Sequence, residues 1–252
     1  MLQLKNLEFK VDSQNGEHEI IDNINLEIDT GKFVVITGPN GGGKSTLAKL
    51  IMGIEKPTAG QIFLDGEDIT DLPVNERAKL GIGYGFQTPP RFKGLTVRKL
   101  LSLAHGSELP MNECSNYLTS VGLCSADYLN REVDSSLSGG EVKRIEIATL
   151  MARELKVAIY DEPEAGIDLW SFAKLVETFK AISKGRHKSV IIISHQERIM
   201  QIADEIVVLS NGKIADYGPK SEIFPKLIKQ LAGNESCFSN GAENDGSCFV
   251  RG

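Results

Sequence analysis

The sequence predicts an α/β fold in which a mostly parallel sheet carries an N-terminal antiparallel β-subdomain and a helical insertion. Three observations lead to this prediction. After residue 136, apolar strand-like runs alternate with helical patterns, which is typical of a parallel sheet covered on both faces. The run at 33–37 is almost entirely apolar and precedes a glycine-rich loop, as expected of a buried strand. Ile24, Leu26 and Ile28 alternate with polar residues, as in an antiparallel strand with one buried face.

The elements follow from local patterns along the chain. Antiparallel strands are expected within 1–33, with a turn at 29–32. The glycine-rich loop opens a helix from about Lys44 to Met52, which Gly53 ends. Further strands are expected at 61–64, 82–86, 157–160, 189–194, 206–209 and 214–215, and helices at 75–80, 141–155, 169–182, 197–203 and most of 220–232.

The segment 88–136 interrupts the α/β pattern. Pro89 and Pro90 break regular structure, and helical spacing follows Thr96. We therefore expect one domain over 1–233, with a helical subdomain at about 88–136. Residues 234–252 are rich in Asn, Ser, Gly and Glu, which predicts a disordered polar tail that holds Cys237 and Cys248.

Bulk composition narrows the class of protein. The 252 residues carry a formal net charge of −6, which argues against a free-standing nucleic-acid-binding protein. No apolar run approaches the roughly 20 residues that a membrane helix needs, and no secretory signal is evident at the start. We expect a cytoplasmic protein that meets a membrane, if at all, through a partner.

The loop after strand 33–37 has the pattern G-x-x-x-x-G-K-S/T of a phosphate-binding loop. Glycines let successive N–H groups point inward, and the start of the following helix adds partial positive charge. Lys44 is expected to reach the β- and γ-phosphates, and the hydroxyl of Ser45 to bind Mg²⁺. The candidate nucleotide-binding residues are Gly38, Pro39, Asn40, Gly41, Gly42, Gly43, Lys44, Ser45 and Thr46.

Two acidic residues end the apolar run 157–160. A triphosphate site needs a carboxylate for the metal and a group that orients water. Asp161 is expected to hold Mg²⁺, and Glu162 to act as the general base on the attacking water. Together with the phosphate-binding loop, this pair predicts binding and hydrolysis of a nucleoside triphosphate.

Further motifs resemble those of ABC ATPases. Residues 137–141 read LSGGE and are similar to the signature motif, which commonly ends in Gln. Gln87 is similar to the Q-loop glutamine, 165–168 to the D-loop, and His195 to the switch histidine. This ordered set covers most of 1–220 and implies the P-loop NTPase fold of ABC ATPases, with ATP and Mg²⁺ as ligands.

The resemblance also implies roles for these residues. Ser138, Gly139 and Gly140 would hold ATP bound to the phosphate-binding loop of a second copy, so that ATP closes a dimer and hydrolysis reopens it. His195 would contact the γ-phosphate, and Gln87 would sense Mg²⁺ and signal to the helical insertion. The family commonly stacks an aromatic side chain on adenine, where this sequence has Val11, so base selectivity is expected to be modest.

Three functional interpretations remain open. GGEVKR at 139–144 and HQERI at 195–199 resemble the SufC family, which implies an iron–sulfur cluster assembly ATPase with SufB/SufD-like scaffold partners. Pro163 fits instead the motif of transporter ATPases, which implies a transmembrane permease docked near Gln87 and 88–100. A regulator that binds ATP without hydrolysing it would leave Glu162 idle. The SufC-like interpretation is the preferred one at this point.

Overall fold

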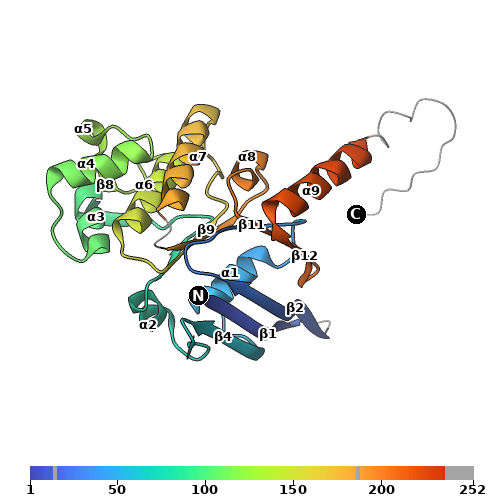
Figure 1. Cartoon of the computed structure of the whole chain (residues 1–252). Helices are drawn as coiled ribbons and strands as arrows, with labels where there is room; N and C mark the ends of the chain where they lie inside the picture. The colour runs from blue at the N-terminus through green and yellow to red at the C-terminus, as the bar shows by residue number, and fades with distance from the viewer. Residues whose placement is uncertain (14–15, 186–187, 236–252) are drawn as a thin grey trace.

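A six-stranded sheet forms the centre of the computed structural model, which describes residues 1–13, 16–185 and 188–235 (Figure 1). Its strands lie in the order β12-β11-β3-β10-β9-β6. All neighbouring pairs are parallel except β11 and β12, which form a hairpin. The strands are β3 (Phe33–Thr37), β6 (Ile82–Gly85), β9 (Val157–Asp161), β10 (Ser189–Ile193), β11 (Glu205–Ser210) and β12 (Lys213–Pro219).

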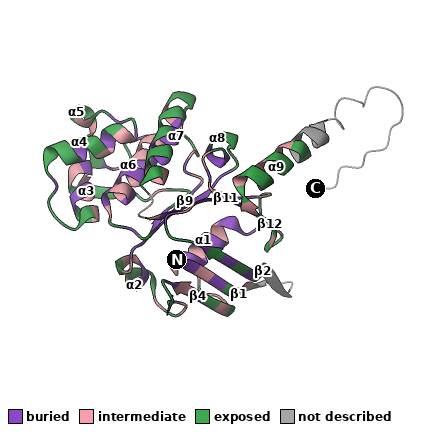
Figure 2. Ribbon diagram, in the orientation of Figure 1, coloured by how far each residue is buried: buried purple, intermediate pink, exposed green. Residues whose placement is uncertain are grey.

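An antiparallel sheet with strand order β2-β1-β4-β5 covers one side of this centre. It consists of β1 (Leu2–Ser13), β2 (Gly16–Ile28), β4 (Ala59–Leu64) and β5 (Glu67–Asp68). Helix α1 (Lys44–Met52) packs into the same core as these strands, and α2 (Val74–Lys79) follows nearby. Figure 2 shows the buried faces of α1 and β1 that meet in this core.

Helices cover the other face of the central sheet. The segment after β6 holds the short strands β7 (Phe92–Thr96) and β8 (Glu132–Val133) and the helices α3 (Val97–His105), α4 (Met111–Ser120) and α5 (Ser125–Tyr128). Helices α6 (Gly139–Ala152) and α7 (Leu169–Lys184) join them to the sheet, and α8 (Glu197–Met200) and α9 (Lys220–Glu235) complete the described chain.

Strand β3 shows how the sheet separates the two cores. Phe33 and Val35 belong to the core beneath the helices, whereas Val34 and Ile36 belong to the core shared with α1. Successive side chains of a strand point to opposite faces, so a strand covered on both sides must be apolar at every position. This explains why 33–37 shows no polar alternation.

The predicted fold class is confirmed, and several local expectations need correction. The segment 88–136 contains the strands β7 and β8 as well as helices, because Phe92 pairs with Val133 across the two ends of the insertion. Helix α9 continues through Asn234 and Glu235, two residues into the predicted tail. Residues 236–252, with Cys237 and Cys248, lie outside the described residues.

Two further points concern the described chain. No helix within 1–13, 16–185 and 188–235 is both long enough and apolar enough to cross a membrane. Val11, at the position where an adenine-stacking aromatic side chain is common in ABC ATPases, is 39% exposed. The nearby aromatic residue Phe9 packs against the core that contains α1.

Candidate functional site

The glycine-rich loop connects β3 to α1 in a conformation that requires glycine. Gly38 has φ +133°, and a Cβ there would lie 1.9 Å from the carbonyl oxygen of Leu209. Gly43 has φ +96°, and its Cβ would come within 2.8 Å of the carbonyl oxygen of Ile20. A side chain at either position would meet backbone and adopt a strained φ. The loop is therefore fitted closely against β2 and β11.

Lys44 lies at the centre of this loop. Its Nζ donates hydrogen bonds of 2.8 Å to the carbonyl oxygens of Gly38 and Pro39, and the side chain is buried. Burial lowers the pKa of Lys44, and the carboxylates of Glu162 and Asp161 oppose this effect. The hydrogen-bond acceptors of this buried ammonium group within the described chain are neutral carbonyl oxygens. An anionic ligand in the cavity would therefore stabilise its charge.

A cavity of about 530 Å³ opens beside the loop. The residues that line it include Lys44, Ser45, Gln87 and Glu162, together with Ile20 from β2. Ile20 could not be predicted as part of the site, because it lies far from the loop in sequence and borders it only through the placement of β2. The start of α1 and the ammonium group of Lys44 suit the negative charge of a triphosphate, whereas the wall at Ile20 is apolar.

An oxygen cluster suited to Mg²⁺ lies at the start of α1. Ser45 Oγ is 3.0 Å from Asp161 Oδ1, and the hydroxyl of Tyr84 donates to Asp161 Oδ2 at 2.8 Å. Asp161 is 1% exposed. Hydroxyl and carboxylate oxygens are ligands that Mg²⁺ prefers, so this donor set fits the metal. The hydrogen bond from Tyr84 orients the carboxylate of Asp161. This role could not be predicted, because a tyrosine in a short buried strand is normally a core residue.

The structure brings Gln87 and Glu162 together. Gln87 Nε2 donates to Glu162 Oε2 at 2.7 Å. Glu162 has φ +45°, and its N–H donates to the carbonyl oxygen of Ile193 at 3.0 Å. A non-glycine residue with positive φ is uncommon and often marks a functional position. The turn after β9 thus aims Glu162 into the cavity instead of continuing the strand.

His195 follows the neighbouring strand β10. Burial lowers the pKa of His195, the positive charge of Lys44 lowers it further, and the negative charge of Glu162 opposes both. The preceding Ser194 donates to Glu164 Oε1 at 2.6 Å and accepts from the N–H of Gln196. The bond between Ser194 and Glu164 links the loop that carries His195 to the turn that carries Glu162. Burial raises the pKa of Glu164.

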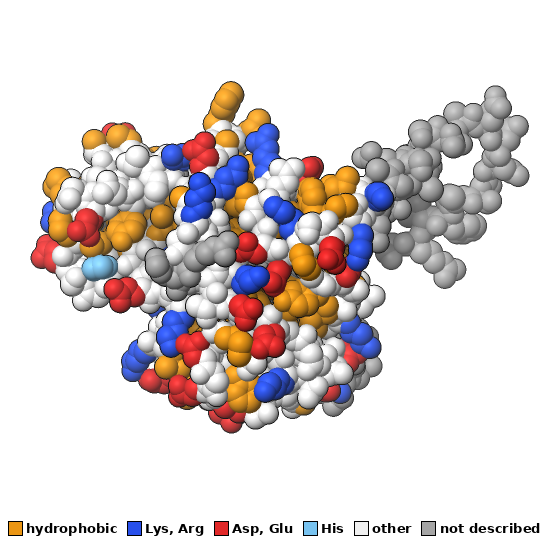
Figure 3. All heavy atoms as spheres, in the orientation of Figure 1, with side chains coloured by type: hydrophobic (Ala, Val, Ile, Leu, Met, Phe, Trp, Pro, Cys, Tyr) orange, Lys and Arg blue, Asp and Glu red, His pale blue; other side chains and the backbone are white. Residues whose placement is uncertain are grey.

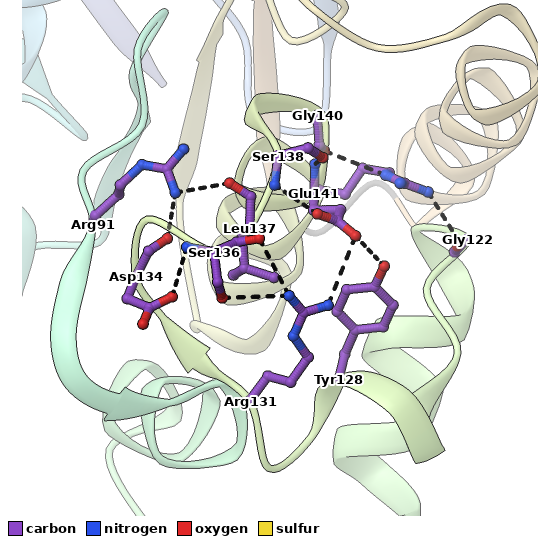
Figure 4. A network of polar contacts seen from close by, with 11 residues as sticks. Arg91, Gly122, Tyr128, Arg131, Asp134, Ser136, Leu137, Ser138, Gly140 and Glu141 are labelled. Atoms are coloured by element: carbon purple, nitrogen blue, oxygen red, sulfur yellow. Dashed lines mark hydrogen bonds and ion pairs between the residues drawn. The ribbon is translucent and has the colours of Figure 1, made fainter.

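The LSGGE segment forms the start of α6, away from the cavity. Ser138 caps the helix by accepting from the N–H of Glu141, whose Oε2 accepts from the N–H of Ser138 at 2.6 Å. Figure 4 shows that Glu141 also contacts Tyr128 and Arg131. The described lining of the cavity includes none of Ser138, Gly139 and Gly140. The glycine-rich loop and the LSGGE segment are therefore two separate elements of one chain.

Lys143 connects these two elements and was missed by the sequence analysis. It is 2% exposed, and its Nζ donates to the carbonyl oxygens of Phe86, of Gln87 at 3.3 Å and of Asp161 at 3.0 Å. Burial lowers its pKa. A lysine within a helix reads as a surface residue, and its direction becomes visible only once α6 is placed against β6 and β9.

A larger cavity of about 710 Å³ has Phe86 in its lining. It forms an apolar groove between the sheet and the helical insertion, with Phe92, Leu100 and Leu103 in its lining. Glu146 Oε1 accepts from the N–H of Phe86 at 3.0 Å, and burial raises the pKa of Glu146 to about 7. Phe86 is therefore bonded to α6 through both its N–H and its carbonyl oxygen.

Comparisons with known proteins agree with this geometry. A family model described as ABC transporter matches residues 21–165. The uncharacterized ABC transporter ATP-binding protein MJ0035 of Methanocaldococcus jannaschii is 38% identical over 216 residues, which cover 82% of this chain and 86% of MJ0035. The sulfate/thiosulfate import ATP-binding protein CysA of Synechocystis sp. is 35% identical over 219 residues, which cover 85% of this chain and 60% of CysA.

A solved structure extends the match to the whole fold. The dimeric structure of a post-hydrolysis state of the ATP-binding cassette MJ0796, bound to ADP and Pi, aligns with a TM-score of 0.78 at 26% identity. The alignment covers 87% of this chain and 99% of that chain. This similarity supports the assignment of the P-loop, ABC-type fold.

Proposed function

The chain belongs to the ABC transporter ATPase family, and we propose that it is the nucleotide-binding subunit of a membrane transporter. It is an ATPase that uses ATP with Mg²⁺, and proteins of this family act as dimers with transmembrane partners. The comparisons favour the transporter over the cluster-assembly interpretation preferred from the sequence, because MJ0035 and CysA are both named as ATP-binding proteins of transport systems.

The observation that carries the proposal is the position of the apolar groove. Its wall at Phe86 is adjacent in sequence to Gln87, and Gln87 Nε2 lies 2.7 Å from Glu162 Oε2. A permease segment docked in the groove would press on the same short loop that holds Gln87. Movement of a partner can thereby be coupled to the position of the carboxylate in the nucleotide cavity.

In the proposed reaction, the chain's own groups position and activate water. The N–H groups of the glycine-rich loop and Lys44 would hold the phosphates, and Ser45 and Asp161 would hold Mg²⁺, which would neutralise charge on the phosphates. Glu162 accepts a proton from the water whose oxygen attacks the γ-phosphorus, and the bond to the bridging oxygen of ADP breaks. His195 orients the γ-phosphate, and Gln87 reports occupancy of the metal site.

A second copy completes the site in this proposal. The start of α6 presents Ser138, Gly139 and Gly140, and a Cβ at Gly139 would meet no atom within 4 Å. This open helix start can receive the phosphates of ATP held by another chain. Binding of ATP then closes the dimer, and hydrolysis opens it.

A second candidate is the ATPase of an iron–sulfur cluster scaffold that resembles the SufC family. It is favoured by Glu141, Lys143 and Arg144 in the GGEVKR segment, and by the exposed Val11 in place of an aromatic side chain. The partners would then be SufB/SufD-like proteins and not a permease. Affinity purification of the tagged chain from its host separates the two functions: an integral-membrane protein supports the transporter, and a β-rich scaffold overturns it in favour of cluster assembly.

The catalytic part of the proposal is tested by Glu162→Gln. We expect phosphate release to fall by about 100-fold or more, because the general base is lost. With Mg-ATP the variant is expected to elute as a dimer on size-exclusion chromatography, since the trapped nucleotide is not consumed. Lys44→Ala is the matched control and should bind no ATP and stay monomeric. A Glu162→Gln protein that retains full phosphate release would contradict the assigned role.

A further inference from the structure

Helix α7 begins with two exposed apolar side chains. Trp170 is 86% exposed and Leu169 is 67% exposed, which are the two highest values among the exposed large apolar residues of the described chain. The buried face of α7 is formed by Phe172, Leu175 and Phe179. Trp170 lies two positions before Phe172 and therefore points away from the core. Figure 3 shows hydrophobic side chains protruding at the upper edge of the view, over α7.

The backbone that carries the exposed tryptophan is fixed by a helix cap. Asp168 Oδ1 accepts hydrogen bonds of 3.0 Å from the N–H groups of Trp170 and Ser171, which caps the helix. Single exposed apolar residues are common on protein surfaces. A tryptophan beside an exposed leucine on a capped first turn is different, because it presents a large apolar surface and only its two side-chain torsions remain to be ordered on binding.

The start of α7 lies next to the start of α6. A Cβ on Gly140 would come within 2.9 Å of the carbonyl oxygen of Gly166, and within 3.7 Å of the Cα of Ile167. The turn 165–168 thus packs directly on the LSGGE segment. Leu169 and Trp170 consequently border the same face that presents Ser138 and Gly139 to solvent.

We infer that Leu169 and Trp170 form a contact surface for a second copy of this chain, closed only in the ATP-bound dimer. The inference rests on the proposed function, in which the second copy brings its nucleotide to the start of α6. A chain that covers this helix start must also approach the adjoining start of α7. A symmetric dimer then uses the surface twice, once on each copy.

The expected effect on affinity is large. Truncation of a tryptophan at an interface commonly costs enough to weaken binding tenfold or more, and here two copies of the side chain are lost. In the Glu162→Gln background, Trp170→Ala should raise the dissociation constant of the Mg-ATP dimer by about tenfold or more. Mg-ATP binding to the monomer should stay unchanged, because Trp170 does not line the nucleotide cavity.

Trp170 is the single tryptophan of the 252 residues, so its fluorescence reports this surface alone. With saturating Mg-ATP, the Glu162→Gln protein should show emission at shorter wavelength and weaker quenching by acrylamide, in parallel with dimer formation on the column. Met111→Ala is the matched control, since Met111 is 58% exposed and lies at the start of α4. That substitution should leave the dimer unchanged.

Each outcome decides the inference. A dimer with unchanged Trp170 emission and quenching overturns the contact surface while the proposed dimer stands. Emission that responds only to a co-purified permease or scaffold assigns the surface to that partner and overturns the second-copy assignment. A chain that stays monomeric with Mg-ATP removes the proposed dimer and this inference with it.

Discussion

The carboxyl group of Glu146 lies in the wall of the apolar groove, with one oxygen bonded and the other buried. Oε1 accepts from the N–H of Phe86, and Oε2 has no hydrogen-bond partner among the described residues. Burial raises the pKa of Glu146 to about 7, although the hydrogen bond from Phe86 and the charge of Lys143 act in the opposite direction. The carboxyl group is therefore partly protonated near neutral pH.

Glu146→Gln should change how stability depends on pH. The folded state keeps the proton between pH 4.5, the ordinary pKa, and about 7, whereas the unfolded chain has released it. The free energy of unfolding of the natural chain therefore falls as pH rises through this window. Glutamine keeps an acceptor for Phe86 and does not ionise, so the variant should be more stable at pH 8 by up to roughly 3 kcal/mol.

Urea unfolding of both proteins at pH 5 and pH 8 measures this difference, because other titrating groups cancel in the comparison. The two stabilities should converge at pH 5, apart from the effect of the amide itself. A difference that does not change between the two pH values would contradict a raised pKa for Glu146.

At the scale of elements, the end of α1 depends on a single buried arginine. Arg77 of α2 is 1% exposed, and its guanidinium donates to the carbonyl oxygens of Leu50 and Ile51 at 2.7 and 2.9 Å. It also donates to the carbonyl oxygens of Thr70 and Leu72. The last carbonyls of a helix lack the usual intrahelical partners, and here Arg77 supplies charged donors to them, beside the N–H of Gly53, which donates to the carbonyl oxygen of Leu50 at 3.1 Å.

Arg77→Met should destabilise the protein by about 3 kcal/mol or more, because four carbonyl oxygens lose a charged donor at once. Lys79→Met is the matched control on the same helix, since Lys79 is exposed and forms only an ion pair with Glu76. Thermal unfolding of the two variants measures the difference. Equal melting temperatures would show that water replaces the guanidinium at the end of α1.

Local sequence signals predicted the elements that carry the phosphate chemistry. Strand 33–37 and helix 44–52 agree with β3 and α1, because an apolar run and a glycine stop act within a few residues. Arg77, Lys143 and Glu146 could not be predicted, because a charged side chain on a helix normally points to solvent and only tertiary packing reverses it. The pairing of β7 with β8 joins residues about 40 positions apart and leaves no local pattern.

At the scale of the whole molecule, the nucleotide cavity and the LSGGE segment lie on different parts of the fold. The nucleotide cavity belongs to the sheets and α1, whereas the LSGGE segment begins the helix that packs against α3 and α4. Arg91 follows Gln87 by four residues, and its Nη1 donates to the carbonyl oxygens of Asp134 and of Leu137, the latter at 2.9 Å. Figure 4 shows this arginine reaching the residues just before Ser138.

Arg91→Ala should weaken the ATP-dependent dimer without changing nucleotide binding by the monomer. The carbonyls of Asp134 and Leu137 lose a charged donor, so the turn before Ser138 is less fixed and must be ordered when the second copy binds. Because both copies lose this bond, we expect the dissociation constant of the Mg-ATP dimer to rise by about tenfold in the Glu162→Gln background.

Arg98→Ala is the control, since Arg98 lies on the same insertion and pairs with Glu108 at 3.6 Å on the surface. Sedimentation measures the dimer, and titration with a fluorescent ATP analogue measures the monomer. A dimer of undiminished affinity would show that the LSGGE segment is ordered by Glu141, Tyr128 and Arg131 alone, and that Arg91 does not couple the two parts of the fold.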